Sequence, residues 1–211
     1  MRLTKAPVPG GTASVTGVRI AIVGSGPAGL SAAAHAARLG LSHVLLEKTD
    51  HLSDTIYKYQ KGKHVMATPS QLVLRSPLDF EAGKREVVLG TWNEQTAAAG
   101  VNVKHNAEVK SIVGTGPAIA GSVMQLVSRN RDGTTSTTEL QRHAPPYKLT
   151  LTTGEEIMAD AVIMAIGTQG NPNLMGCPGG NLPHVQYQLD DPTEYTDEHI
   201  FVIGGGDAGI E

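Results

Sequence analysis

The chain has 211 residues, enough for one large domain or for one domain and part of a second. Its net charge of -3 predicts no nucleic-acid partner, and no apolar run approaches the roughly 20 residues that span a membrane. A single cysteine excludes an intrachain disulfide and a cysteine-rich zinc site, and without a signal-peptide pattern we expect a cytoplasmic protein.

The first regular elements should form one β-α-β unit. A short run of mostly apolar residues over 18–23 predicts a buried parallel strand, and residues 24–29 predict a turn. The Ala- and Leu-rich segment 28–39 predicts a helix that ends at Gly40, and a second strand is expected over 44–47.

The next segments are expected to alternate between loop and helix. Residues 50–86 mix polar residues with prolines, which predicts a loop with short helical turns. Residues 85–100 predict a helix that closes at Gly100.

The second half of the chain predicts mainly strands. Strands are expected over 101–106, 108–114, 122–130, 147–154 and 161–166, with a turn at Asp132-Gly133. The polar stretch 133–146 is expected to be an exposed excursion.

Gly24, Gly26 and Gly29 form G-x-G-x-x-G between a predicted strand and a predicted helix. In such a motif the first glycine permits a tight turn, the second leaves room for a pyrophosphate, and the third lets helix and strand pack closely. Glu47 closes the second strand, 23 residues after Gly24, where a carboxylate would accept hydrogen bonds from ribose hydroxyls. A tight turn without a ligand is the alternative, and this context favours a dinucleotide site.

The same spacing occurs again at Gly204, Gly206 and Gly209, after an apolar strand predicted over 199–203. We interpret it as the opening of a second nucleotide-binding domain, although a natural chain end at Glu211 is the alternative. An apolar edge strand without a complete sheet should pack against the first domain, pair with a second copy of the chain, or be poorly ordered. The sequence therefore leaves open whether the chain forms a homodimer.

These motifs resemble the flavoproteins with two dinucleotide-binding domains, the pyridine nucleotide-disulfide oxidoreductase superfamily typified by thioredoxin and glutathione reductases. Pro27 and Ala28 stand where that family's FAD-binding turn often has them. Residues 165–167 are similar to its second signature, a loop that approaches the FAD, and 100–112 resemble the segment whose backbone near Glu108 and Val109 meets the adenine.

The resemblance implies an α/β fold: a Rossmann-like FAD-binding domain with three-layer ββα character and a β-meander at 101–153, incomplete at the C-terminus. It divides the chain into a flexible leader (1–17), the N-terminal portion of the FAD-binding domain (18–167), a linker (168–198) and the first strand and turn of a truncated NAD(P)-binding domain (199–211). The resemblance also implies which residues bind FAD: Gly24, Gly26, Pro27, Ala28, Gly29, Glu47, Lys48, Val109, Ala165 and Gly167. In the parent protein Gly204, Gly206 and Gly209 would bind the second nucleotide, NAD(P)H.

The activity that the resemblance implies is a thioredoxin-reductase-like oxidoreductase, in which electrons pass from a nicotinamide through FAD to an acceptor protein, domain or small molecule. The cysteine pairs of both typical members are missing here, and Cys177 is interpreted as a packing residue. We expect no catalytic acid or base, no metal site, and little activity from this chain alone. Four residues of the stretch after Glu47 are candidates to face the flavin ring, with a solvated basic loop as the alternative: Lys61, Lys63, His64 and Met66.

Two other functions stay open at this stage. Gly180 and His184 have the spacing of part of a flavin-monooxygenase signature, but Pro178 stands where that signature has Phe. The second alternative is a non-catalytic FAD-binding or interaction module.

Overall fold

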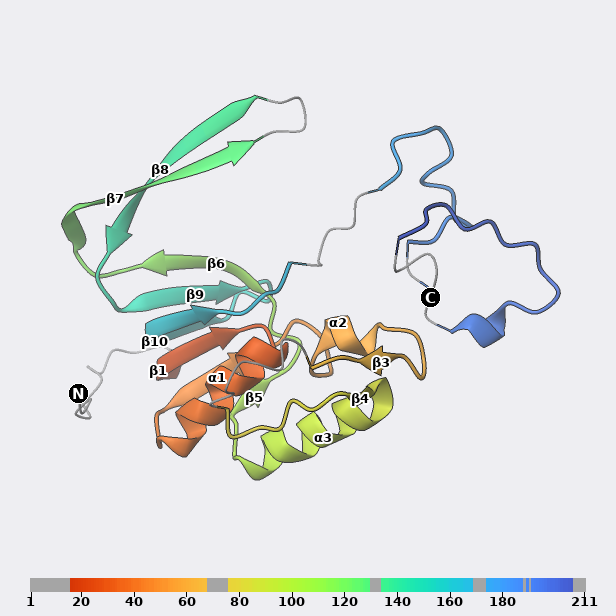
Figure 1. The fold of residues 1–211 in the computed structure, drawn as a ribbon. Helices are drawn as coiled ribbons and strands as arrows, with labels where there is room; N and C mark the ends of the chain where they lie inside the picture. The colour runs from red at the N-terminus through yellow and green to blue at the C-terminus, as the bar shows by residue number, and fades with distance from the viewer. Residues whose placement is uncertain are drawn as a thin grey trace.

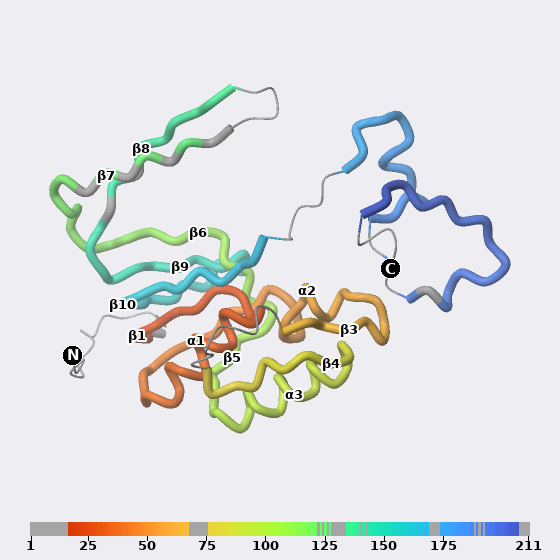
Figure 2. Tube along the Cα trace, viewed as in Figure 1, coloured from red at the N-terminus to blue at the C-terminus, as the bar shows by residue number. Residues whose placement is uncertain are grey.

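A computed structural model describes residues 16–67, 76–129, 134–168, 174–187, 189 and 191–206. The body is a six-stranded sheet with helices α1 and α3 on one side, from which a long hairpin projects (Figure 1). The described residues between 174 and 206 extend away from the sheet as an arm, and the one regular element among them is a short 3-10 helix, η1 (Pro192–Glu194) (Figures 1 and 2).

Parallel strands make up most of the sheet, whose order is β5-β2-β1-β10-β9-β6. The parallel strands are β5 (Val103–Lys104), β2 (His43–Leu46), β1 (Thr16–Val23) and β10 (Glu156–Met164). The antiparallel strands β9 (Tyr147–Leu151) and β6 (Val109–Gly114) follow on the β10 side. The predicted α/β, Rossmann-like fold is therefore confirmed.

Helix α1 (Pro27–Arg38) follows β1 directly and begins with Pro27 in its first turn, a position where the missing proline N–H costs nothing. It ends before Gly40, whose φ of +65° gives the left-handed residue that closes a helix. Helix α3 (Arg85–Ala98) ends in the same way, at Gly100 with φ +66°. Both predicted helices are confirmed to within two residues at each end.

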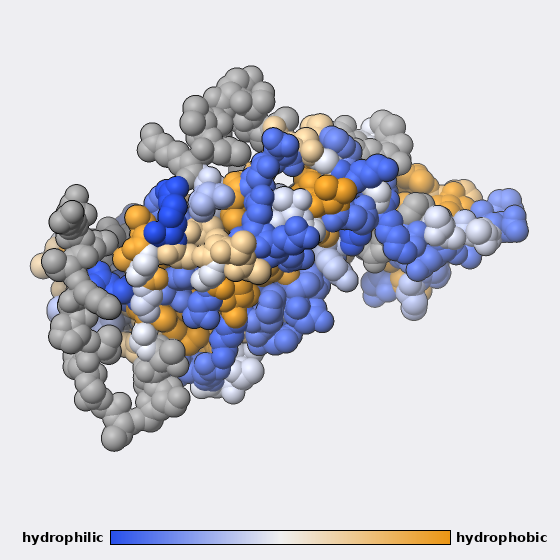
Figure 3. Space-filling view, turned by 90° about the horizontal axis from the view of Figure 1, so that it is seen from below, coloured by the Kyte–Doolittle hydropathy of each residue, from blue (hydrophilic) through white to orange (hydrophobic). Residues whose placement is uncertain are grey.

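The core consists of two clusters of buried apolar side chains, one associated with each face of β1 and β2. Ile22 and Leu45 belong to the helix-side cluster, together with Leu30 from α1 and Trp92 from α3. The other cluster joins the parallel strands to the antiparallel ones; its buried members are Ala21, Val23, Val44, Leu46, Ala107, Leu149, Leu151, Ile157 and Ala159. Seen from below the view of Figure 1, hydrophobic and hydrophilic residues alternate in patches over the surface (Figure 3).

The expected β-meander is divided between two sheets. Strand β5 pairs with β2 in the parallel half, and β6 and β9 extend the same sheet. Strands β7 (Ala118–Arg129) and β8 (Thr135–His143) form a separate antiparallel hairpin. The predicted turn at Asp132-Gly133 lies outside the described residues.

Three local predictions are wrong in whole or in part. Residues 134–139 are exposed, as predicted for the excursion over 133–146, but the same segment contains strand β8, which periodicity missed because its residues 135–139 are polar. Residues 199–203 form no strand, since none of the described strands pairs with them, and Phe201 is 90 % exposed. The end of the predicted leader, Thr16 and Gly17, belongs to β1.

The loop predicted over 50–86 contains three short elements in its described part. They are α2 (Asp54–Tyr57), β3 (His64–Val65) and β4 (Gly83–Lys84), and the two strands pair with each other. No helix in the described part of the chain is long and apolar enough to cross a membrane.

Trp92 should contribute strongly to folding stability. Its side chain is 4 % exposed, contacts the ring of Phe80 edge-on at a centroid distance of 5.2 Å, and donates a hydrogen bond to the Asp79 carbonyl at 2.9 Å. We expect Trp92→Ala to lower the free energy of unfolding by about 3–5 kcal/mol, measured by chemical denaturation. Val87→Ala, at a position on the same helix that is 63 % exposed, is the control and should cost less than about 1 kcal/mol.

Candidate functional site

The turn after β1 lies where the carboxyl ends of three strands meet. The Gly24 N–H donates to the Leu46 carbonyl at the end of β2, at 2.8 Å. The Ala165 N–H, just beyond β10, donates to the Val23 carbonyl at 2.8 Å. Because β2 and β10 flank β1 on opposite sides, the turn stands at the topological switch point where open α/β sheets bind ligands.

The three glycines of the turn meet different requirements. Gly24 has φ +97°, and a Cβ atom on it would lie 2.4 Å from the Ala165 carbonyl oxygen. A Cβ atom on Gly29 would lie 1.8 Å from the Gly24 carbonyl oxygen. At Gly26 a Cβ atom would meet no atom within 4 Å. The packing of the chain itself therefore requires the first and third glycines, while the second borders open space.

The N-terminus of α1 opens at this turn. Leu30 makes the first helical hydrogen bond, from its N–H to the Gly26 carbonyl at 2.9 Å. No side chain caps this helix, and its first turn holds no acidic residue. The first-turn N–H groups and the positive end of the helix dipole can therefore receive an anion beside Gly26.

Glu47 follows β2 and is buried, with 5 % of its surface exposed. Its Oε2 accepts hydrogen bonds from the Ser25 N–H, at 3.0 Å, and from the Ser25 hydroxyl. Its Oε1 accepts from the Thr49 N–H at 3.1 Å, and the Thr49 hydroxyl lies at the same distance. The carboxylate therefore connects the glycine turn to the loop that follows β2.

Ser25 and Ser53 are two site residues that the sequence reasoning missed. The Ser53 N–H donates to Ser25 Oγ at 2.9 Å, and the Ser53 hydroxyl donates to the Ser25 carbonyl at 3.0 Å. Both residues are 1 % exposed, and Ser53 has φ +58°, a conformation that is uncommon for a residue other than glycine. No sequence pattern could signal this pair, since 28 residues separate the two serines.

The other predicted binding residues lie around the same edge of the sheet. Ala165 and Gly167 follow β10, and Val109 opens β6. The Ala107 N–H donates to the Glu47 carbonyl at 2.8 Å, which places the segment leading to Val109 next to the end of β2. Lys48 is exposed and follows Glu47 directly.

Apolar residues near the glycine turn are exposed. Met164 at the end of β10 is 55 % exposed and Ile166 is 67 % exposed. Pro27 and Ala28 on the first turn of α1 are also exposed. The surface beside the uncapped helix end is therefore partly hydrophobic.

The second glycine motif is not part of this edge of the sheet, because none of the described strands contains its residues. Gly204 and Gly206 are exposed and belong to no helix or strand, and Gly204 has φ +118°. Gly209 lies outside the described residues. His184, of the monooxygenase pattern, is exposed in the arm.

Among the four candidates to face a flavin, Lys61 contacts the C-terminal arm instead. Its ammonium group pairs with the carboxylate of Asp191, which is buried. The Lys61 ammonium, helped by the Thr193 hydroxyl and N–H, lowers the pKa of Asp191 from 3.8 to about 2. Lys63 lies over the Tyr59 ring at 5.2 Å from its centroid, and His64 and Met66 are exposed.

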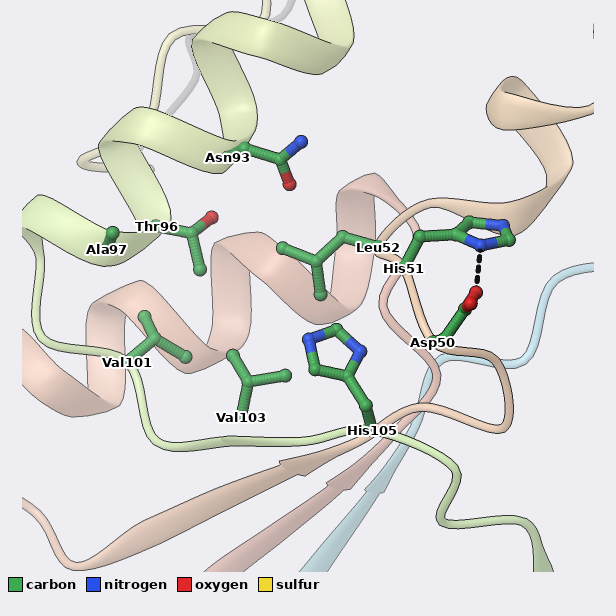
Figure 4. A pocket seen from close by; sticks show the side chains of 9 residues that line it. All are labelled: Asp50, His51, Leu52, Asn93, Thr96, Ala97, Val101, Val103 and His105. Atoms are coloured by element: carbon green, nitrogen blue, oxygen red, sulfur yellow. Dashed lines mark hydrogen bonds and ion pairs between the residues drawn. The ribbon is translucent and has the colours of Figure 1, made fainter.

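One cavity in the described part of the chain is lined by no residue of the glycine turn. It has a volume of about 410 Å³ and opens between α3, β5 and the loop after β2 (Figure 4). Thr96 lines it, and the Thr96 hydroxyl oxygen is buried without a hydrogen-bond partner among the described residues. None of the residues predicted to bind FAD lines this cavity. The described part of the chain also contains no cluster of three or more His, Cys, Asp or Glu residues able to hold a metal ion.

Comparisons with known proteins match nearly the whole chain. Residues 18–211 match the family model described as pyridine nucleotide-disulphide oxidoreductase. The chain is 27 % identical over 191 residues to a ferredoxin--NADP reductase of Ignicoccus hospitalis, covering 90 % of this chain and 50 % of the relative. It is 24 % identical over 190 residues to the bacilliredoxin reductase Bdr of Bacillus subtilis, covering 90 % of this chain and 51 % of the relative.

A solved structure shares the fold. The bacillithiol disulfide reductase Bdr (YpdA) of Staphylococcus aureus aligns with a TM-score of 0.69 at 20 % identity, over 93 % of this chain and 52 % of that one. The chain thus spans about half the length of the curated relatives it matches.

The buried Thr96 hydroxyl should reduce stability. Valine has nearly the same shape as threonine and removes the unpaired polar group, so we expect Thr96→Val to raise the free energy of unfolding by about 1 kcal/mol. Thr91→Val, at a half-buried position on the same helix, is the matched control and should change it by less than about 0.5 kcal/mol. A loss of stability in Thr96→Val would show that the hydroxyl is paired in solution.

The ion pair between Lys61 and Asp191 should form or break with pH. Because the pKa of Asp191 is lowered in the folded chain, the ion pair is fully formed above pH 3.8 and is lost as the pH falls through about 2. Lys61→Met should raise the pKa of Asp191 towards 3.8, as measured by NMR titration of the carboxyl carbon. The control Lys58→Met removes a cation that pairs with Asp54 and should leave Asp191 unchanged. An Asp191 pKa that stays near 2 without Lys61 would contradict the pairing.

Proposed function

Because the chain belongs to the pyridine nucleotide-disulphide oxidoreductase family, we propose that it is the FAD-binding part of an NAD(P)H-dependent flavoprotein oxidoreductase. The observation that carries this proposal is the open space at Gly26, which faces an uncapped helix N-terminus next to the buried carboxylate of Glu47. A dinucleotide needs these three features together: room for its pyrophosphate, N–H donors for the phosphate charge, and an acceptor for its ribose.

The residues present fit the adenosine diphosphate half of FAD. The first-turn N–H groups of α1 would hold the pyrophosphate, and Gly26 would let it approach the backbone. Glu47 would accept a hydrogen bond from the adenosine ribose, and the backbone near Val109 would border the adenine. Lys48, exposed beside Glu47, would lie at the rim of the nucleotide.

The apolar residues at the end of β10 would contact the remainder of the cofactor. Met164 and Ile166 expose hydrophobic surface beside the turn, and a bound flavin would shield it from water. When bound, FAD supplies the redox chemistry by accepting reducing equivalents from a nicotinamide and passing them on. The chain contributes binding and orientation, and Ala165 and Gly167 form the loop next to the cofactor.

The acceptor that we propose is a separate electron carrier, protein or domain. The chain contains one cysteine, Cys177, which is exposed, so this chain cannot itself hold a dithiol relay. The names of the two curated relatives, a ferredoxin--NADP reductase and a bacilliredoxin reductase, refer to such carriers and support this choice. In the whole protein we propose that Gly204, Gly206 and Gly209 begin the NAD(P)H site.

Reconstitution with FAD tests the proposal. Gly26→Ala should fold normally, because the added Cβ atom meets no protein atom, but it should weaken FAD binding at least tenfold by occupying the pyrophosphate space. Bound flavin is measured by its absorbance near roughly 450 nm and by fluorescence titration. Gly90→Ala on α3, where a Cβ atom also meets no protein atom, is the matched control and should bind FAD like the wild type.

Two results would contradict the proposal. A wild-type chain that binds no FAD would refute the FAD site itself. If FAD bound equally well to Gly26→Ala and to the wild type, the pyrophosphate would not lie at this turn.

A further inference from the structure

The cavity between α3, β5 and the loop after β2 is a slot with two facing walls (Figure 4). One wall is a single face of α3, because Asn93, Thr96 and Ala97 stand at positions i, i+3 and i+4 of that helix. The other wall is a single face of the chain through β5, because Val101 and Val103 lie two residues apart. A helix face opposite a strand face encloses a narrow space that suits a flat molecule.

Small side chains leave this slot open. Ala97 has only a methyl group and Thr96 is short, where larger residues would fill the space between a helix and a sheet. Strand β5 is the last strand in the sheet order, so no further described strand adds side chains there. The volume of about 410 Å³ lies within the range of roughly 300–1,000 Å³ that is typical of small-molecule sites.

The lining of the slot favours an uncharged and mostly apolar ligand. Val101 and Val103 present hydrophobic surface and pack against the helix-side core cluster. Among the described residues that line the slot there is no lysine or arginine. The carboxylate of Asp50 pairs with His51 Nδ1 at 2.7 Å, and this pair lies at the rim, away from Thr96 (Figure 4). No unpaired carboxylate or cationic side chain therefore meets a ligand near Thr96.

The Thr96 hydroxyl supplies one polar feature of the slot. Thr96 is 2 % exposed, and its hydroxyl oxygen is buried without a hydrogen-bond partner among the described residues. The side chain extends from α3 towards the space between the helix and β5 (Figure 4). An unpaired buried hydroxyl is unfavourable and indicates that a partner from outside the chain belongs there. Because a hydroxyl both donates and accepts, it suits another hydroxyl.

We propose that this slot is a second ligand site, which takes a neutral molecule with a single aromatic ring and one hydroxyl group, of the phenol class. The ring lies between Ala97 on the helix wall and the two valines of the strand wall. The hydroxyl of the ligand makes a hydrogen bond with Thr96. None of the residues predicted to bind FAD lines the slot, so this inference stands apart from the proposed function.

Phenol and toluene test the site in the full chain without any nucleotide. The two probes have nearly the same shape and differ by a hydroxyl in place of a methyl group. Binding is followed by the NMR shifts of the Val101 and Val103 methyl groups, which line the slot. We expect phenol to bind with a dissociation constant of about 1 mM or lower, the affinity that a ligand of this size can reach.

Thr96→Val separates recognition of the hydroxyl from burial of the ring. We expect this variant to bind phenol at least about fivefold more weakly, because one hydrogen bond is lost, and to bind toluene within about twofold of the wild type. Thr91→Val, at a half-buried position on the same helix that does not line the slot, is the matched control and should bind both probes like the wild type. A purely structural role of Thr96 would change the two affinities together.

Ala97→Leu tests where the probes bind. The larger side chain occupies the slot, so both probes should bind at least about tenfold more weakly. Ala98→Leu, at the neighbouring exposed position, adds the same side chain outside the slot and should leave both affinities unchanged. Circular dichroism of the two variants checks that each is folded.

Three results would overturn the inference. If neither probe shifts the valine methyl groups of the wild type, the slot holds only water. If Thr96→Val weakens phenol and toluene equally, or neither of them, Thr96 does not recognise the hydroxyl. If Ala97→Leu binds both probes like the wild type, they bind elsewhere on the chain.

Discussion

The close contact among three backbone segments at the end of β1 determines where the site lies. Gly24 touches the carbonyl of Ala165, and Gly29 touches the carbonyl of Gly24, at distances that leave no room for a side chain. This contact lets α1 start immediately after β1 and brings the loop after β10 against the same turn. The N-terminus of α1 is therefore aimed at the edge where the strand order reverses.

Buried polar bonds hold the surroundings of this turn in place. Ser25, Glu47 and Ser53 are each at most 5 % exposed, and an unpaired polar group at such depth costs on the order of 1–3 kcal/mol. Here each makes hydrogen bonds to the others or to the neighbouring backbone. The glycine turn, the end of β2 and the following loop thus form one hydrogen-bonded unit, and preorganisation of this kind lowers the entropy that binding must offset.

Local patterns predicted the parts of the site that depend on local chemistry. Gly24, Gly26, Gly29 and Glu47 all belong to one β-α-β unit, so their spacing along the chain is enough to recognise them. The Ser25–Ser53 pair depends on a left-handed residue in a loop without periodicity, which no pattern signals. Strand β8 was missed because its polar residues lack alternation, and 199–203 was predicted as a strand because apolar residues favour one even where no described partner strand exists.

The usual distribution of polar and apolar groups is inverted at the edge that holds the glycine turn. The carboxylate of Glu47 and the hydroxyls of Ser25 and Ser53 are buried there, whereas Met164 and Ile166 are more than half exposed. The buried carboxylate is already hydrogen-bonded within the chain, whereas exposing hydrophobic side chains is unfavourable in an isolated domain. The proposed ligand would offset that cost, since its ring system suits the apolar surface. The polarity of this edge therefore favours one orientation of the nucleotide, with the ribose at Glu47 and the ring beyond β10.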